Sequence, residues 1–167
     1  TSKQNPKSKT SNKQKIKAII FDLDGTLADS EPLHLKTFNQ IFSNYGIKIS
    51  EDYWNKNYSG TNSRFIIEDL KRKHPQIKQS TEGMVQKRAS LFRLEVKKIK
   101  PSKGAKKLIS IAKKNKIKLV VASNSSKKIV KAELQALNMP DIKYFSLDDV
   151  KRRKPAPDLF LKALSWL

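Results

Sequence analysis

The stretch AIIFDLDGT, residues 18–26, decides the fold. Its first four residues are apolar without interruption, which is typical of a strand that is covered on both faces in a parallel sheet. Asp22, Asp24 and a turn at Gly25 follow directly. Alternate residues of an extended chain point the same way, and ligands bind at the carboxyl ends of strands in open α/β sheets. The stretch therefore predicts a buried strand that presents two carboxylates to one binding crevice.

Further along the chain, strand-like and helix-like segments alternate. Residues 119–122 predict a second buried strand that ends in a polar turn, and residues 143–146 are compatible with a short third strand. Apolar residues recur at helical spacing in other segments: 32–44, 62–73, 81–98, a segment capped by Ser102 that carries Leu108, Ile109 and Ile111, a segment with Ile129, Val130, Leu134 and Leu137, and a last one that opens at Pro157. This alternation predicts an α/β fold with a Rossmann-like parallel sheet as its core.

These segments divide the chain into three parts. Residues 1–15 hold no acidic residue and no large apolar residue, so they cannot bury enough surface to fold, and we expect a disordered basic tail. Residues 16–30 and 101–167 contain the predicted strands and form the predicted core. Residues 31–100 are helical throughout, which predicts an inserted helical unit rather than a simple crossover between strands.

The composition excludes several classes of protein. The chain has no cysteine, which excludes disulfide scaffolds, thiol catalysis and cysteine-based metal sites. No apolar run approaches the ~20 residues that span a bilayer, so we expect no membrane partner. The net charge of +21 is mostly lysine, spread along the whole chain with few aromatic residues nearby, which favours solvated helix faces over a nucleic-acid surface. The same positive field would suit a phosphorylated small molecule.

Three polar clusters lie after predicted strands or before predicted helices. Asp22 and Asp24 form the first, Ser123 and Asn124 the second, and Lys154, on a proline-stiffened segment, the third. A hydroxyl and backbone N–H groups near a helix start suit an anion, and the lysine supplies a fixed positive charge. One nucleophilic carboxylate, one proton donor, ligands for an oxyanion and a fixed cation together suit phosphoryl transfer.

The motifs resemble those of a known family. Residues 21–34, FDLDGTLADSEPLH, closely resemble the first motif of the haloacid dehalogenase-like (HAD) hydrolases, especially the branch with β-phosphoglucomutase and small sugar-phosphate phosphatases. Residues 120–126, VVASNSS, are similar to the second motif, and residues 154–160, KPAPDLF, to the third. The three matches occur in the family's order and span most of the chain after the tail, so together they are very specific.

The resemblance implies a role for each cluster. Asp22 would attack phosphorus in line, become an aspartyl-phosphate and ligate Mg²⁺. Asp24 would protonate the leaving oxygen and then activate water, with its backbone carbonyl on the metal. Ser123 and the Asn124 N–H would hold the transferring phosphoryl group, and Lys154 would balance its charge. Mg²⁺ is needed because a carboxylate and a phosphate dianion otherwise repel each other.

The resemblance also implies substrate contacts in the turn and in the helical unit, which would act as a mobile cap. Gly25 and Thr26 are expected in the substrate site. His34 matches a histidine of the mutase-like branch. The sequence is equally compatible with a substrate-gating role for His34 and with a plain histidine on a cap helix. Arg64 resembles a cap arginine that contacts substrate in mutases, but its spacing from the preceding glycine is shifted, which favours a solvated helix arginine.

The chain departs from the family pattern at its end. The fourth motif is an acidic pair after a further strand, and the sequence stops at Leu167 before that strand. Asp148 and Asp149 precede Lys154, so they are not that pair by order. Either the chain is a fragment, or it is a degenerate protein that binds without turnover. Without a further strand, one edge of the first strand would be left unpaired and exposed. This favours the interpretation of the chain as a fragment, which need not itself be active.

The sequence therefore predicts a Mg²⁺-dependent phosphatase that acts on a small phosphorylated metabolite, a sugar phosphate, as a monomer in the cytoplasm. A phosphomutase like β-phosphoglucomutase is the nearest alternative, because it would use the same four residues, Asp22, Asp24, Ser123 and Lys154. A non-catalytic module that binds nucleic acid through a basic surface is the alternative from another class.

Overall fold

The structure is a computed structural model that describes residues 15–167. The tail predicted over residues 1–15 lies outside the described residues, except for Lys15. Within residues 15–167, no helix combines the length and the apolarity needed to cross a membrane.

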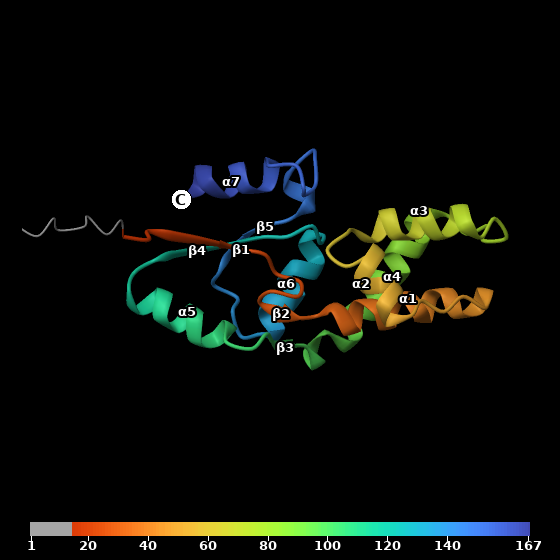
Figure 1. The fold of residues 1–167 in the computed structure, drawn as a ribbon, viewed down its shortest axis with the longest axis horizontal. Helices are drawn as coiled ribbons and strands as arrows, with labels where there is room; N and C mark the ends of the chain where they lie inside the picture. Colours follow the sequence, from red (N-terminus) through yellow and green to blue (C-terminus); the bar gives the residue numbers. More distant parts are fainter. Residues whose placement is uncertain (1–14) are drawn as a thin grey trace, which may run out of the picture.

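A three-stranded parallel sheet forms the centre of the fold (Figure 1). Its strands are β1 (Ala18–Phe21), β4 (Lys118–Ala122) and β5 (Lys143–Phe145), in the order β1-β4-β5. Ile20 is in register with Val120, which is fully buried. The predicted parallel α/β sheet is therefore confirmed, and β1 has β4 as its neighbour on one side only among the described strands. A small antiparallel pair, β2 (Ala28–Asp29) and β3 (Lys100–Pro101), joins the two chain segments that flank the helical insertion.

Helices cover both faces of this sheet. On one face, α5 (Ala105–Lys114) and α6 (Lys127–Ala136) pack on side chains that include Phe21 and Val121. On the other face, Leu159 and Ala163 of α7 (Asp158–Trp166) pack on Val120. This two-sided cover explains why the strands are apolar at successive positions rather than at alternate ones.

The start of α5 corrects one expectation. Ser102 does not cap this helix, which begins at Ala105 after Gly104, a residue with φ of 86°. The Ser102 N–H donates to the Leu27 carbonyl oxygen over 2.9 Å, beside the β2–β3 pair. This hydrogen bond ties the Ser102 backbone to the segment that precedes β2, and the helix starts three residues further along the chain.

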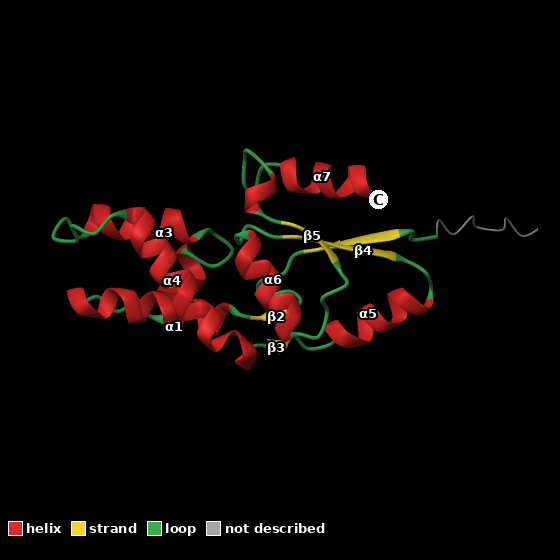
Figure 2. Cartoon of the chain, turned by 180° about the vertical axis from the view of Figure 1, so that it is seen from behind, coloured by secondary structure: helices red, strands yellow, loops and turns green. Residues whose placement is uncertain are grey.

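The inserted segment folds into helices that lie beside the sheet (Figure 2). They are α1 (Glu31–Phe42), α2 (Glu51–Asn57), α3 (Ser63–Lys73) and α4 (Thr81–Glu95), with the 3₁₀ turns η1 (Ser43–Tyr45) and η2 (Val96–Lys98). The Ser50, Asn62 and Ser80 side chains accept hydrogen bonds from backbone N–H groups at the starts of α2, α3 and α4. These helices enclose an apolar cluster of their own, which includes Phe38, Trp54 and Met84.

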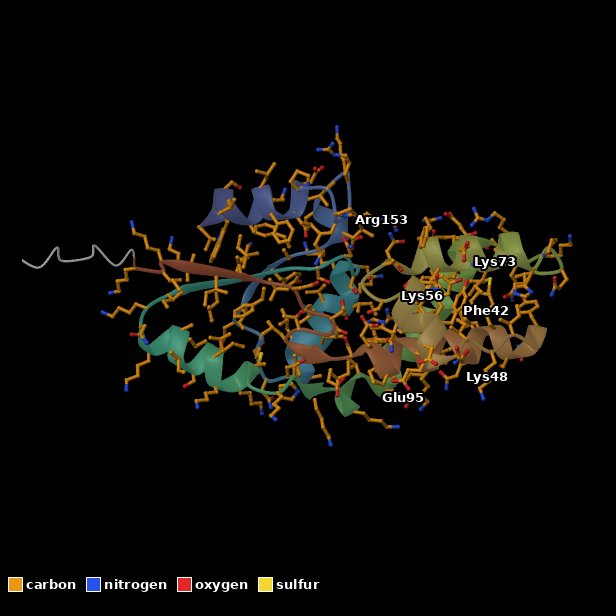
Figure 3. All side chains as sticks on the ribbon, in the orientation of Figure 1. Phe42, Lys48, Lys56, Lys73, Glu95 and Arg153 are labelled. Carbon is orange, nitrogen blue, oxygen red and sulfur yellow. The ribbon has the colours of Figure 1, made fainter. Side chains whose placement is uncertain are left out.

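The sheet and the helical unit touch near the C-terminal ends of the strands. The guanidinium of Arg153, labelled in Figure 3, lies 4.8 Å from the ring centre of Phe65 on α3. Lys48, Lys56 and Lys73, labelled in the same view, are exposed residues of the helical unit. Lys56 and Lys73 lie on α2 and α3, so part of the positive charge of the chain lies on exposed helix positions.

Candidate active site

The candidate site lies where β1 and β4 end. Asp22 follows β1 directly, and the Lys154 Nζ atom lies 2.7 Å from its Oδ1 atom. The same Nζ donates to the Ala122 carbonyl oxygen at the end of β4 over 3.0 Å. Asp22, Asp24, Asn124 and Lys154 line one cavity of about 280 Å³, whose opposite wall is formed by the helical unit. The volume is near the lower end of the ~300–1,000 Å³ of small-molecule sites.

Asp24 accepts four hydrogen bonds. Its Oδ1 atom lies 2.8 Å from the Ser30 hydroxyl and 2.7 Å from His34 Nε2. Its Oδ2 atom accepts from the Ser123 hydroxyl over 3.3 Å and from the Ser125 hydroxyl over 3.0 Å. Burial alone would raise the pKa of the Asp24 carboxyl, but His34 and Ser30 outweigh it and hold this pKa well below its usual range. The group is therefore a carboxylate in this arrangement.

The two predicted site residues of the polar turn after β4, Ser123 and Asn124, contact different parts of the site. Ser123 is fully buried and does not line the cavity, because its hydroxyl points to Asp24. The Asn124 side chain accepts from the Lys154 N–H over 2.9 Å, and its amide donates to the Lys154 carbonyl over 3.3 Å and to the Gly60 carbonyl of the helical unit over 3.1 Å. Ser125 and Ser126 also line the cavity, although they were not predicted site residues, and their place in the same polar turn was the available signal.

Gly25 and Thr26 lie in the tight turn after β1 and do not line the cavity. Gly25 has φ of 69°, a left-handed conformation that favours glycine. Its N–H donates to the Ala28 carbonyl, and the Thr26 N–H donates to the Leu23 carbonyl. In this structure the two residues shape the backbone that carries Asp22 and Asp24.

A buried polar cluster connects Asp24 to the helical unit. His34 lies on α1 and stacks on the Phe92 ring at 4.5 Å between ring centres. Its Nδ1 atom contacts the guanidinium of Arg88, which also donates to the Thr37 and Ser63 hydroxyls over 3.2 Å. Burial lowers the pKa of Arg88 to about 10, so the group stays charged at neutral pH. Sequence reasoning missed Arg88, whose only signal is its helical spacing between Met84 and Phe92 on the buried face of α4.

Glu133 on α6 completes this cluster. Its side chain is fully buried, and neither of its carboxylate oxygens has a hydrogen-bond partner among the described residues. Its Oε1 atom lies 3.6 Å from His34 Nε2. Burial and the nearby Asp24 charge raise the pKa of Glu133 to about 8, so its carboxyl is protonated at neutral pH.

Asp24, His34 and Glu133 together could suggest a metal site, because their ligand atoms lie within 4.8 Å of one another. The hydrogen bonds argue against it. An arginine can only donate, so its contact with Nδ1 leaves the imidazole proton on Nε2, where it is donated to Asp24. An ion on Nε2 would have to displace that proton.

A magnesium ion fits better at Asp22. Its side chain is 43% exposed and lines the cavity, as does Asp148 from the loop before Lys154. Carboxylate and carbonyl oxygens are the ligands that Mg²⁺ prefers. Asp148 lies in the 3₁₀ turn η3 (Leu147–Asp149), and its Oδ2 atom accepts from the Lys127 N–H over 2.8 Å. Asp149 accepts from the Ser146 N–H and hydroxyl and caps the same turn.

Arg64 lies at the far wall of the cavity, on α3. Its guanidinium pairs with Glu82 of α4, which also lines the cavity, and lies 3.9 Å from Glu68. The Arg64 side chain is 54% exposed, so it faces both the cavity and the solvent.

Comparisons with known proteins agree with this geometry. A family model described as haloacid dehalogenase-like hydrolase matches residues 19–167. The 6-phosphogluconate phosphatase of Escherichia coli (strain K12) is 31% identical over 153 residues, which cover 89% of this chain and 67% of that protein. The crystal structure of CbbY from Rhodobacter sphaeroides in complex with phosphate has a TM-score of 0.80 at 28% identity, covering 90% of this chain and 72% of that one. The crystal structure of a putative β-phosphoglucomutase from Thermotoga maritima has a TM-score of 0.66 at 26% identity, covering 90% and 70%. The chain belongs to the haloacid dehalogenase-like hydrolase family.

Proposed function

We propose that the protein is a Mg²⁺-dependent phosphatase that hydrolyses a small phosphorylated metabolite, a sugar phosphate, through an aspartyl-phosphate on Asp22. The observation that carries this proposal is the position of the Asp22 carboxylate, at the end of β1, open to the cavity and 2.7 Å from the Lys154 ammonium. A relative named as a phosphorylated carbohydrates phosphatase, 28% identical to this chain, and a related structure in complex with phosphate support the substrate class.

In the first step, an Asp22 oxygen forms a bond to phosphorus while the bond from phosphorus to the sugar oxygen breaks. The leaving oxygen takes a proton from Asp24. Lys154 stabilises the charge that develops on the phosphoryl oxygens. In the second step, Asp24 takes a proton from water, the water oxygen attacks phosphorus, and Asp22 is released together with inorganic phosphate.

The Asp22 carboxylate and the Asp24 backbone carbonyl would hold the magnesium ion. When bound, it offsets the repulsion between the Asp22 carboxylate and the phosphate dianion.

Asp24 must leave its present hydrogen bonds to act as an acid. In the arrangement described, it is ionised and held by His34 of α1 and by hydroxyls of the core. A change in the position of α1 would shift His34 and free the carboxyl. This contact favours the gating role of His34 over that of a plain helix histidine.

A phosphomutase is the second candidate, favoured by the similarity to the structure titled putative β-phosphoglucomutase. It would use the same residues but return the phosphoryl group to a sugar hydroxyl instead of water. Conversion of β-glucose 1-phosphate to the 6-phosphate with little free phosphate would favour the mutase.

The test is a phosphate-release screen over sugar phosphates, with and without Mg²⁺, on the wild type and Asp22→Asn. We expect Mg²⁺-dependent release by the wild type and its loss in Asp22→Asn, with an unchanged circular dichroism spectrum. Asp29→Asn is the matched control, because Asp29 is exposed and outside the cavity lining. Release that persists in Asp22→Asn would contradict the mechanism.

A further inference from the structure

The cavity is acidic, although the chain as a whole is strongly basic. Its lining includes five carboxylates, those of Asp22, Asp24, Glu31, Glu82 and Asp148. Only three residues with a permanent positive charge line it, one lysine and two arginines. The positive charge that gives the chain +21 therefore lies mainly outside the cavity.

Two of the three cations are already engaged. Lys154 lies between Asp22 and the Ala122 carbonyl, where it serves the transferred phosphoryl group. Arg88 is 3% exposed and directs its donors to two hydroxyls and to His34. A second anionic group on a substrate could use Arg88 only by breaking this buried network.

The third cation, Arg64, is matched by negative charge. Its guanidinium contacts the Glu82 carboxylate, and Glu68 lies one helical turn away at 3.9 Å. Elsewhere in the lining, the Glu31 carboxylate accepts from the Trp54 indole N–H over 2.6 Å and adds further negative charge to the cavity. The wall opposite the phosphoryl position thus offers an arriving anion no uncompensated positive charge.

We propose that Glu82 is a specificity-determining residue, which makes the cavity select phosphate monoesters whose remaining part is neutral and rich in hydroxyl groups. A second phosphate or a carboxylate would have to displace Glu82 from Arg64, or lie beside the carboxylates of the lining. Sugar hydroxyls, in contrast, can donate to these carboxylates, which only accept hydrogen bonds when ionised. The inference rests on the proposed phosphatase function and names the substrate class of the same site.

The experiment compares three six-carbon substrates: glucose 6-phosphate, glucose 1,6-bisphosphate, which keeps the sugar ring, and the open-chain 6-phosphogluconate. Phosphate release with Mg²⁺ gives kcat/KM for each. We expect the wild type to prefer glucose 6-phosphate. Glu82→Gln should raise kcat/KM for the two substrates with a second anionic group, relative to glucose 6-phosphate, by about two- to fivefold, the upper part of the range expected for one exposed ion pair.

Two variants sharpen the test. The double variant Arg64→Gln, Glu82→Gln should lose the gain, since it removes the cation that Glu82 masks. Glu51→Gln makes the same charge change at an exposed position of α2 outside the cavity lining, and it should keep the wild-type preference.

A wild type that releases phosphate from the bisphosphate or from 6-phosphogluconate as readily as from glucose 6-phosphate would overturn the inference and leave the phosphatase function intact. An unchanged preference in Glu82→Gln would also overturn it. No release from any substrate, p-nitrophenyl phosphate included, would contradict the proposed function itself.

Discussion

Substitution of the buried Glu133 by glutamine should change how the stability of the protein depends on pH. Glutamine has nearly the shape of a protonated glutamic acid, but it does not ionise. In the folded protein, burial and the Asp24 charge raise the pKa of Glu133 from 4.5 to about 8. Between these two values the folded chain binds a proton that the unfolded chain has released, so the free energy of unfolding of the wild type falls as the pH rises.

The size of this effect follows from the two pKa values. A tenfold change in proton affinity corresponds to about 1.4 kcal/mol. The proton on Glu133 therefore contributes at most roughly 5 kcal/mol, which is fully present below about pH 4.5 and lost by about pH 8. In Glu133→Gln this contribution to the pH dependence disappears. The variant should match the wild type near pH 5 and exceed its stability near pH 8, by about 3–5 kcal/mol.

Urea unfolding at several pH values between about 5 and 8 measures the difference. Titrating groups that do not contact Glu133 are common to both proteins and cancel in the comparison, whereas the contribution of His34, whose pKa depends in part on Glu133, belongs to the measured difference. Glu51→Gln is the control, since the exposed Glu51 should leave the wild-type pH dependence unchanged. Parallel stability curves for the wild type and Glu133→Gln would show that Glu133 is ionised or solvated in the folded protein, and would refute the reasoning.

Three other substitutions test single contacts. Tyr58→Phe removes the hydroxyl that donates to Asp69 over 2.6 Å, and should lower the free energy of urea unfolding by about 1–2 kcal/mol; a loss below the error of the measurement would contradict this. Leu159→Ala opens a cavity between α7 and the sheet, where Leu159 is fully buried, and thermal and urea unfolding should show a loss of about 2–5 kcal/mol. Asn124→Ala removes three hydrogen bonds of a buried side chain, two of them to the Lys154 backbone, and should lower the free energy of urea unfolding by about 1–3 kcal/mol and kcat for phosphate release by about tenfold. A wild-type kcat in this variant, measured under conditions where it is folded, would show that these bonds do not position Lys154 for the reaction.

The sheet and the location of the candidate site could be predicted because their causes are local in the sequence. Continuous apolar runs identified β1 and β4, and the polar residues after each run placed Asp22 and Ser123 at the same edge. The approach of Lys154 to Asp22 is not local. It was expected only because the order of the motifs resembles that of the family.

The buried ionisable groups could not be predicted, because their burial depends on how other elements pack around them. Arg88 and Glu133 lie at helical positions where the pattern allows either a core residue or a solvated one. What keeps Arg88 inside is its contact with His34, 54 positions earlier in the chain. Helix α2 could not be predicted either. Only Trp54 is buried among its seven residues, and one buried residue gives no helical period.

The placement of His34 and Arg88 explains how packing in the helical unit can control chemistry at the sheet. Phe92, near the end of α4, belongs to the apolar cluster that also contains Phe21 and Val121 of the sheet. Phe38 and Met84 belong to the separate cluster inside the helical unit. His34 and Arg88 lie between these two clusters, and His34 is the residue that contacts Asp24. A polar layer between two apolar clusters keeps its position only while its hydrogen bonds are satisfied. Any shift of α1 against α4 would therefore alter the contact that holds Asp24. Under the proposed mechanism, the protonation of Asp24 would then depend on the position of the helical unit.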